Sequence, residues 1–261
     1  MPAHQLLEET AVVRLHTQAF DRLYFIELES PNIASALQPG QFVHMQIPCM
    51  PDKILRRPFS VYSVDRVAGT LKILYQVVGA GTEVMTQMHE GQTCSLIGPI
   101  GNTWTPPADA PALLVAGGVG SAPLYMLAQE MSAAGTGLTV VLGAQTKGAH
   151  VAYEDYARLE NCALITATDD GSFGYDGFCT VPAQEAISSG TFGYVAVCGP
   201  EPVIKMVSGM ALEAGIPCEV SLERRMACGV GACLSCVVDT TEGKKRCCVD
   251  GPIFQAAEVV W

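Results

Sequence analysis

The sequence predicts a multidomain β and α/β protein whose 261 residues divide into three parts. Short alternating strands fill residues 1–105, which indicates an N-terminal antiparallel β-barrel. Strands then alternate with helices over residues 110–217, a pattern typical of an α/β domain with a parallel sheet. Residues 218–261 are rich in cysteine and form a small third domain. This division agrees with the length, which suits about two ordinary domains and a small third one.

Composition and charge exclude several classes of protein. Hydrophobic residues make up 49% and charged residues 16%, which supplies a folded core and argues against disorder. The net charge of −11 makes nucleic acid and anionic membranes poor partners. The chain opens without the basic and apolar regions of a secretory signal. Because the eleven cysteines include a metal-ligand spacing, we expect reduced thiols and a cytoplasmic location.

The barrel prediction depends on runs of strand-forming residues separated by turn signals. Apolar and polar residues alternate most cleanly at 42–47 and 71–77. Proline, glycine and asparagine mark turns between runs, for example at 30–32 and 39–40. One helix is expected at 82–89. The predicted strands are 11–15, 23–28, 42–47, 71–77 and 94–97.

A proline-rich linker at 104–111 leads into the α/β part. The uncharged stretch 110–129 is long enough for a membrane helix, but its turn formers at 116–123 favour a buried strand, a glycine turn and a helix. We therefore predict no membrane segment. Buried strands are expected at 113–116, 138–142, 162–167 and 194–198, and helices at 123–134, 153–160 and 201–214.

Cysteines near the C-terminus carry the strongest chemical signal. Cys228, Cys233 and Cys236 have the x4 and x2 spacing of plant-type 2Fe–2S proteins, and a fourth thiol follows a short basic hairpin. The glycine-rich loop between the first two allows backbone amides to turn toward sulfur. A structural zinc site is the alternative, although such sites usually have two paired knuckles. The spacing leaves open whether Cys247 or Cys248 is the fourth ligand.

Two motifs in the barrel suit a phosphate-containing ligand. Arg57 and Ser60 flank Pro58 and Phe59 at the start of a strand, where an arginine fork can bind a diphosphate and a serine can add a hydrogen bond. The alternative is a surface arginine on the barrel rim. The second motif follows Leu74, Tyr75 and Gln76, where a strand gives way to the glycine turn at Gly81 and to Thr82. Thr82 can bind phosphate at a helix N-terminus or cap the helix.

The α/β part places turn residues after its strands. Carboxyl ends of parallel strands are where such sheets bind nucleotides. The Gly-Gly-Val-Gly turn is a weak dinucleotide signal by itself, and Cys198 could equally be a core thiol. After the strand 138–142 there is neither an acid for a ribose hydroxyl nor an arginine for a 2′-phosphate, so charge does not distinguish NADH from NADPH. The candidate residues for the dinucleotide are Gly117, Gly118, Gly120, Asp170, Cys198 and Gly199.

These motifs, in this order, resemble the ferredoxin–NADP reductase superfamily. The stretches 221–233 and 248–254 narrow the resemblance to the family of electron-transfer subunits of the two-subunit, NAD-linked dihydroorotate dehydrogenase B. The resemblance covers essentially the whole chain and is most specific at the cysteines. It implies that the fourth ligand is Cys248, because that residue precedes x-Asp-Gly-Pro, so the metal ligands are Cys228, Cys233, Cys236 and Cys248.

The resemblance also implies cofactors and a partner. The partner is an FMN-containing dihydroorotate dehydrogenase catalytic subunit, with two of each subunit in a heterotetramer. Electrons pass from its FMN to the cluster, to FAD and to NAD+, in pyrimidine biosynthesis. A flavin collects single electrons and delivers a hydride, which agrees with this order. The FAD residues implied are Arg57, Pro58, Phe59, Ser60, Leu74, Tyr75, Gln76, Gly81 and Thr82.

Two alternatives remain at this stage. One is a related FAD and 2Fe–2S reductase subunit of a sulfite reductase or a ferredoxin-linked transhydrogenase. The other is a zinc-bearing regulatory protein with a vestigial nucleotide fold. The five histidines have no ligand spacing and are expected to be exposed or packed, and no catalytic acid–base pair is assigned.

Overall fold

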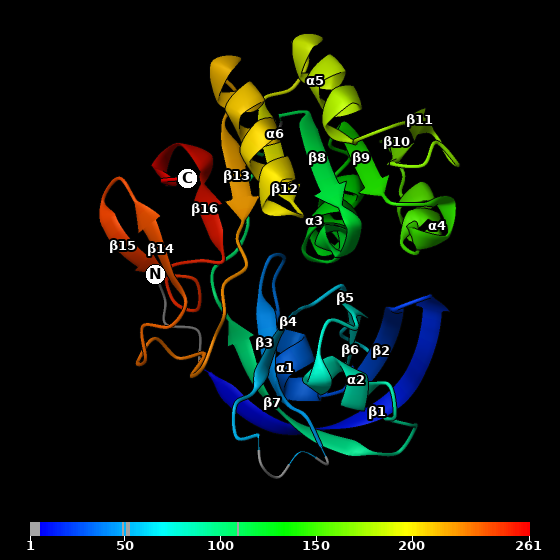
Figure 1. The fold of residues 1–261 in the computed structure, drawn as a ribbon, viewed down its shortest axis with the longest axis vertical. Coiled ribbons are helices and arrows are strands. Elements are labelled where there is room, and N and C mark those ends of the chain that lie inside the picture. Colours follow the sequence, from blue (N-terminus) through cyan, green and yellow to red (C-terminus); the bar gives the residue numbers. More distant parts are fainter. Residues whose placement is uncertain (1–5, 49, 51–52, 109) are drawn as a thin grey trace.

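The computed structural model describes residues 6–48, 50, 53–108 and 110–261 (Figure 1). The first part forms an antiparallel sheet, as the alternating runs predict, with strand order β4-β3-β7-β1-β2-β6-β5. The sheet curls around an apolar core that includes Val43, Met45 and Ile73. The strands are β1 Leu7–Phe20, β2 Leu23–Glu29, β3 Phe42–Gln46, β4 Arg57–Ser60, β5 Ser63–Asp65, β6 Thr70–Gln76 and β7 Thr93–Ile100.

Two short helices accompany this barrel. α1, Pro31–Ala36, begins where a turn is predicted, and proline suits its first position. The Glu9 carboxylate from β1 accepts hydrogen bonds from the amide of Ile33 at 3.1 Å and from Asn32 Nδ2 at 3.0 Å. This tertiary cap, which local sequence does not reveal, turns the segment into a helix. α2, Ala80–Met85, starts two residues before the predicted helix and is shorter than it.

The second sheet has strand order β11-β10-β9-β8-β12-β13-β16. All neighbours are parallel except β13 and β16, which pair antiparallel. The sheet thus takes two strands from the cysteine-rich segment, beyond residue 217. Its strands are β8 Ala112–Gly117, β9 Leu138–Ala144, β10 Cys162–Thr168, β11 Tyr175–Asp176, β12 Tyr194–Cys198, β13 Cys218–Ser221 and β16 Ile253–Gln255.

Helices cover both faces of this sheet (Figure 1). α5, Thr180–Ser188, and α6, Glu201–Glu213, pack on one face, and α5 was not predicted. α3, Ser121–Ala133, packs on the other face with α4, Tyr153–Ala157. Most of α3 is buried, because the helix packs on the second sheet and its Met126 also contacts the barrel core. This burial explains the uncharged stretch as a strand, a 3-10 turn and a buried helix.

No helix in the described ranges is long and apolar enough to cross a membrane.

Buried polar contacts fix the linker and the C-terminal segment. Trp104 donates its indole N–H to the Pro123 carbonyl at 3.0 Å. The buried carboxylate of Glu219 accepts hydrogen bonds from the Thr105 amide and from Gln255 Nε2, both at 2.8 Å, and from the Tyr194 hydroxyl. One carboxylate therefore joins the linker, β12, β13 and β16. The remaining strands, β14 Val237–Thr240 and β15 Gly243–Arg246, form the predicted hairpin beside the cysteines.

Candidate functional site

The predicted cluster thiols lie in two pairs. The Cys233 amide donates to Cys228 Sγ at 3.4 Å, which brings these two residues together. Cys236 Sγ and Cys248 Sγ are 3.3 Å apart. In the described part of the chain, no three His, Cys, Asp or Glu side chains gather around one point as a single metal ion requires. Two pairs of thiols can hold two irons, each taking two thiolates.

The structure distinguishes the adjacent cysteines. Both residues are buried in the same core, but the Cys248 sulfur lies 3.3 Å from Cys236 Sγ, and no such sulfur contact of Cys247 is found among the described residues. The Cys247 amide donates to the Cys236 carbonyl at 2.9 Å, which aligns the two segments. The Arg246 guanidinium and amide bind the Asp250 carboxylate at 3.1 and 2.8 Å and close the turn that holds Cys248. This arrangement favours Cys248 as the fourth ligand, as the resemblance implies.

The loop also supplies donors for a thiolate. Cys228 Sγ accepts hydrogen bonds from the amides of Val230 at 3.5 Å and Cys233 at 3.4 Å. The Val230 amide is the main cause that lowers the pKa of Cys228 to about 6. A thiolate is the form that binds iron, so the loop fits the ligand role of this residue. Cys233 is exposed, and so are three apolar residues of the C-terminal segment, Val230, Leu234 and Val249.

At the barrel rim, Arg57 lies against Gly81 in the first turn of α2. A Cβ on Gly81 would be 3.1 Å from Arg57 Nε, so the absence of a side chain lets the guanidinium lie over this turn. The Thr82 hydroxyl accepts hydrogen bonds from the amides of Val78 at 2.9 Å and Gly79 at 3.2 Å. Thr82 therefore orders the turn, as its capping alternative expects. An arginine beside a glycine turn can contact a diphosphate, and the FAD role of Arg57 and Gly81 remains a prediction.

The other barrel residues predicted for the flavin divide between two faces. Tyr75 points into the barrel, where its hydroxyl is 2.9 Å from His16 Nε2 and its ring packs edge-on against Phe59 with centroids 6.1 Å apart. Leu74 points the other way, into the core shared with α3. Pro58 and Ser60 pair with the outward-facing residues of β3, and Gln76 is exposed. Strand alternation thus separates residues that are adjacent in the sequence.

Two glycine turns meet at the carboxyl ends of β8 and β12. A Cβ on Gly120 would lie 2.4 Å from the Cys198 carbonyl oxygen, and a Cβ on Gly199 would lie 2.9 Å from the Gly117 amide nitrogen. Close packing of two backbones therefore requires these glycines. Gly118 has φ +56° and nothing within 4 Å of its missing Cβ, so its backbone is open to a ligand.

Asp170 and Cys198 differ in their surroundings. Asp170 is at the end of β10, where its carboxylate accepts hydrogen bonds from the Ser172 hydroxyl at 2.6 Å and amide at 3.0 Å, and these lower its pKa. Cys198 is buried, and burial raises its pKa to about 12. This agrees with the alternative of a core thiol. A role for either residue in dinucleotide binding remains a prediction.

His44 on β3 is a residue that the sequence did not single out. Its ring is fully buried, and neither ring nitrogen has a hydrogen-bond partner among the described residues. It faces outward from the barrel, between Pro58 on β4 and Gly229 in the cysteine loop. The clean alternation at 42–47 could have predicted that His44 lies on this face. It could not have predicted that the ring is buried there.

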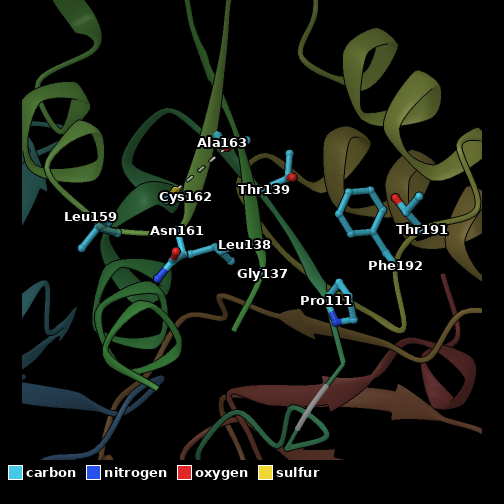
Figure 2. A pocket seen from close by; sticks show the side chains of 10 residues that line it. All are labelled: Pro111, Gly137, Leu138, Thr139, Leu159, Asn161, Cys162, Ala163, Thr191 and Phe192. Atoms are coloured by element: carbon cyan, nitrogen blue, oxygen red, sulfur yellow. Dashed lines mark hydrogen bonds between the residues drawn. The ribbon is translucent and has the colours of Figure 1, made fainter. Parts of the chain in front are cut away.

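A shallow pocket of about 630 Å³ lies at the end of the second sheet opposite to these glycine turns (Figure 2). It is formed at the amino ends of β8, β9 and β10. Nucleotides bind at the carboxyl ends of such strands, so this pocket is separate from the predicted dinucleotide site. The residues that line it are Pro111, Gly137, Leu138, Thr139, Leu159, Asn161, Cys162, Ala163, Thr191 and Phe192.

Comparison with known proteins matches each part of this architecture. An oxidoreductase FAD-binding domain matches residues 11–104, and an oxidoreductase NAD-binding domain matches residues 114–209. The iron-sulfur cluster binding domain of dihydroorotate dehydrogenase B matches residues 223–260. The FAD, NAD and iron–sulfur assignments made from sequence are thereby confirmed at the level of domains.

Curated relatives match over nearly the whole chain. The dihydroorotate dehydrogenase B (NAD(+)) electron transfer subunit of Desulforamulus reducens is 40% identical over 243 residues, 91% of this chain and 92% of that protein. The chain belongs to the family of dihydroorotate dehydrogenase B electron transfer subunits. The family member from Enterococcus faecalis is 36% identical over 265 residues, 98% of this chain and 99% of that protein. As a member of this family, the chain is an electron-transfer subunit of an oxidoreductase.

Solved structures share the fold. The structure of an NADH-dependent reduced ferredoxin–NADP oxidoreductase has a TM-score of 0.88 and 30% identity, and the match covers 96% of this chain and 90% of that one. A ferredoxin–NADP+ reductase from Neisseria gonorrhoeae has a TM-score of 0.65 at 16% identity, and the match covers 81% of this chain and 92% of that one. This second match shows the fold alone. This chain thus has the ferredoxin reductase-like architecture predicted from its sequence.

Proposed function

We propose that this chain carries electrons from the FMN of a dihydroorotate dehydrogenase catalytic subunit to NAD+, in pyrimidine biosynthesis. The observation that carries the proposal is the pairing of Cys228 with Cys233 and of Cys236 with Cys248, in a loop whose amides stabilise a thiolate. The family models and the names of the relatives support the same reading. When bound, a 2Fe–2S cluster supplies one-electron transfer and FAD supplies conversion to a two-electron hydride.

Each of the three predicted domains has a task in this proposal. Residues 1–105 hold FAD, with Arg57 over the Gly81 turn as the diphosphate contact. Residues 110–217 hold NAD at the open backbone of Gly118. Residues 218–261 hold the cluster through the four cysteines. The exposed Cys233 and the exposed apolar residues Val230, Leu234 and Val249 contribute to the docking face for the catalytic subunit, in a heterotetramer of two copies of each.

Co-expression with the FMN-containing subunit tests the function. The purified complex should reduce NAD+ when dihydroorotate is added, and this chain should hold about two irons and two sulfides. A complex that oxidises dihydroorotate but leaves NAD+ unchanged, or a chain that binds zinc, contradicts the proposal.

The Arg57 assignment has its own test with a matched control. Arg57→Ala should yield a chain that keeps its iron and sulfide but loses FAD absorbance. Arg56→Ala is the control, because the Arg56 guanidinium already binds Glu8 at 2.6 Å and the Ser95 carbonyl at 2.9 Å. Full FAD occupancy in Arg57→Ala refutes the role.

A second function is favoured by one observation. The NADH-dependent reduced ferredoxin–NADP oxidoreductase structure matches nearly the whole chain at 30% identity. A chain that serves such a complex would transfer electrons between ferredoxin and pyridine nucleotides and would not respond to dihydroorotate. The same co-expression assay, repeated with reduced ferredoxin in place of dihydroorotate, separates the two functions.

A further inference from the structure

His44 occupies the junction between the barrel and the cysteine loop. It pairs with Pro58 on β4 and with Ile97 on β7, and its neighbours Val43 and Met45 point into the barrel core. Strand alternation therefore directs the imidazole outward, to the side where the C-terminal segment lies.

The cysteine loop is built around this ring. A Cβ on Gly229 would lie 2.5 Å from His44 Nδ1 and 3.1 Å from its Cε1, so the imidazole occupies the space that any side chain at 229 would need. Gly229 has φ +70° and is buried. It follows Cys228 directly, and the next amide donates to Cys228 Sγ. The ring thus contacts the loop one residue from a predicted ligand.

Neither ring nitrogen reaches hydrogen-bond geometry with a described residue, although the backbone of Arg56 lies near the ring. The residues beside it are Pro58, which has no amide N–H, Ile97, which is apolar, and Gly229, which presents its Cα. Burial, followed by the charge of Arg56, lowers the pKa of His44 to about 4, although a backbone contact with Arg56 opposes this shift. In either protonation state the imidazole carries at least one ring N–H that can donate a hydrogen bond. A buried N–H without an acceptor costs free energy, so an acceptor is expected at this place.

We propose that His44 is a positioning residue for the iron–sulfur cluster: its imidazole braces Gly229 and its ring N–H donates a hydrogen bond to a sulfur of the bound cluster. This inference rests on the proposed cluster at Cys228, Cys233, Cys236 and Cys248. Cluster sulfurs are acceptors, and donors to them stabilise the reduced, more negative state. His44 therefore raises the midpoint potential of the cluster.

The test measures the potential and the EPR spectrum of the cluster in the full chain with its cofactors. His44→Leu should lower the potential, with about a tenfold shift of the one-electron equilibrium, equal to ~59 mV, and should change the g values. His44→Gln, whose amide keeps an N–H, should restore most of the wild-type potential. His89→Gln is the control, because His89 is exposed and its ring contacts only its neighbour Glu90 in the described structure.

Several results would overturn the inference. One is a His44→Leu chain that holds its cluster with unchanged potential and g values. Another is a shift confined to the flavin, which would place the ring N–H on FAD. If the His44→Leu chain does not hold iron, the potential and g values are measured on His44→Met instead, because the flexible methionine side chain can adapt to the same space. A wild-type chain without iron and sulfide would instead refute the proposed function itself.

The bracing contact has an independent test in a double-mutant cycle. Gly229→Ala should reduce iron content in the wild-type background, because its methyl meets the ring. In a His44→Ala background the same change should cost less, since the backbone strain at φ +70° is present in both backgrounds and cancels. Equal losses in the two backgrounds would exclude the brace.

Discussion

The hydroxyl of Tyr62, in the barrel, donates a hydrogen bond to the Asp155 carboxylate of α4 at 2.8 Å. The Tyr62 ring also stacks on Tyr125 of α3, with centroids 4.5 Å apart and planes 13° from parallel. Residues 93 positions apart thus join the FAD-binding and NAD-binding domains through an aromatic and polar contact. The contact holds the two domains in one orientation.

Tyr62→Phe keeps the stacking and removes this hydrogen bond. We expect a loss of about 1–2 kcal/mol in the free energy of unfolding. This value is small for a hydrogen bond to a charged group, because Asp155 is partly exposed and water can solvate it. Urea unfolding measures it. Tyr153→Phe is the control, since the Tyr153 hydroxyl has no hydrogen bond within the described residues. Equal stability of the two variants would contradict the prediction.

Gly81→Ala should weaken FAD binding about tenfold, or ~1.4 kcal/mol. The new methyl would meet Arg57 Nε at 3.1 Å and push the guanidinium from the turn. Fluorescence titration of the flavin-free chain with FAD gives the dissociation constant. Gly79→Ala should bind normally, because nothing lies within 4 Å of that Cβ and its φ of −177° suits any residue. The prediction is wrong if both variants bind FAD equally.

Cys248→Ser should remove the cluster, whereas Cys247→Ser should leave it in place. Cys248→Ser removes the sulfur that faces Cys236, so we expect loss of most of the iron and sulfide. Cys247→Ser places a hydroxyl in the buried core and should lower stability by about 1–3 kcal/mol while the cluster remains. Metal analysis and EPR separate the two results. Retained iron in Cys248→Ser, with loss in Cys247→Ser, would exchange the assignments.

After removal of the cluster with a chelator, Cys228 should be alkylated far faster at neutral pH than Cys248. The loop amides lower the pKa of Cys228 to about 6, whereas burial raises that of Cys248 to about 12. Since the thiolate is the reactive form, the rate at Cys228 should fall as pH decreases through about 6. Mass spectrometry of the chain treated with iodoacetamide from pH 5 to 9 measures both rates. A midpoint above pH 8 at Cys228 would show that the amides do not stabilise the thiolate.

Much of the fold follows from local patterns in the sequence. Alternation predicted β3 and β6, and the change to long apolar runs predicted β8, β9, β10 and β12. The turn formers in the uncharged stretch correctly favoured a strand and a buried helix over a membrane span. The cysteine spacing named Cys228, Cys233 and Cys236, and the family resemblance added Cys248, whose sulfur lies 3.3 Å from Cys236 Sγ in the structure. Each of these signals lies within a few residues of sequence.

The features that sequence did not reveal depend on distant contacts. α1 replaces a predicted turn because Glu9 caps it from another strand. His44 is buried, and the loop at Gly229, 185 positions later, helps to cover its ring. β13 and β16 are short, and they join the second sheet by pairing with each other and with β12. No local pattern encodes which partner a segment of three or four residues finds.

The return of β16 to the sheet after the cysteine loop has a consequence for protein engineering. Truncation at residue 217 would delete two strands, uncover the edge of β12 and leave Tyr194 facing water without Glu219. Such a fragment should aggregate rather than yield a simple flavin reductase. A chimera that exchanges the cysteine loop would need both crossover points between the end of β13 and the start of β16. The recipient protein would then keep all strands of its own sheet.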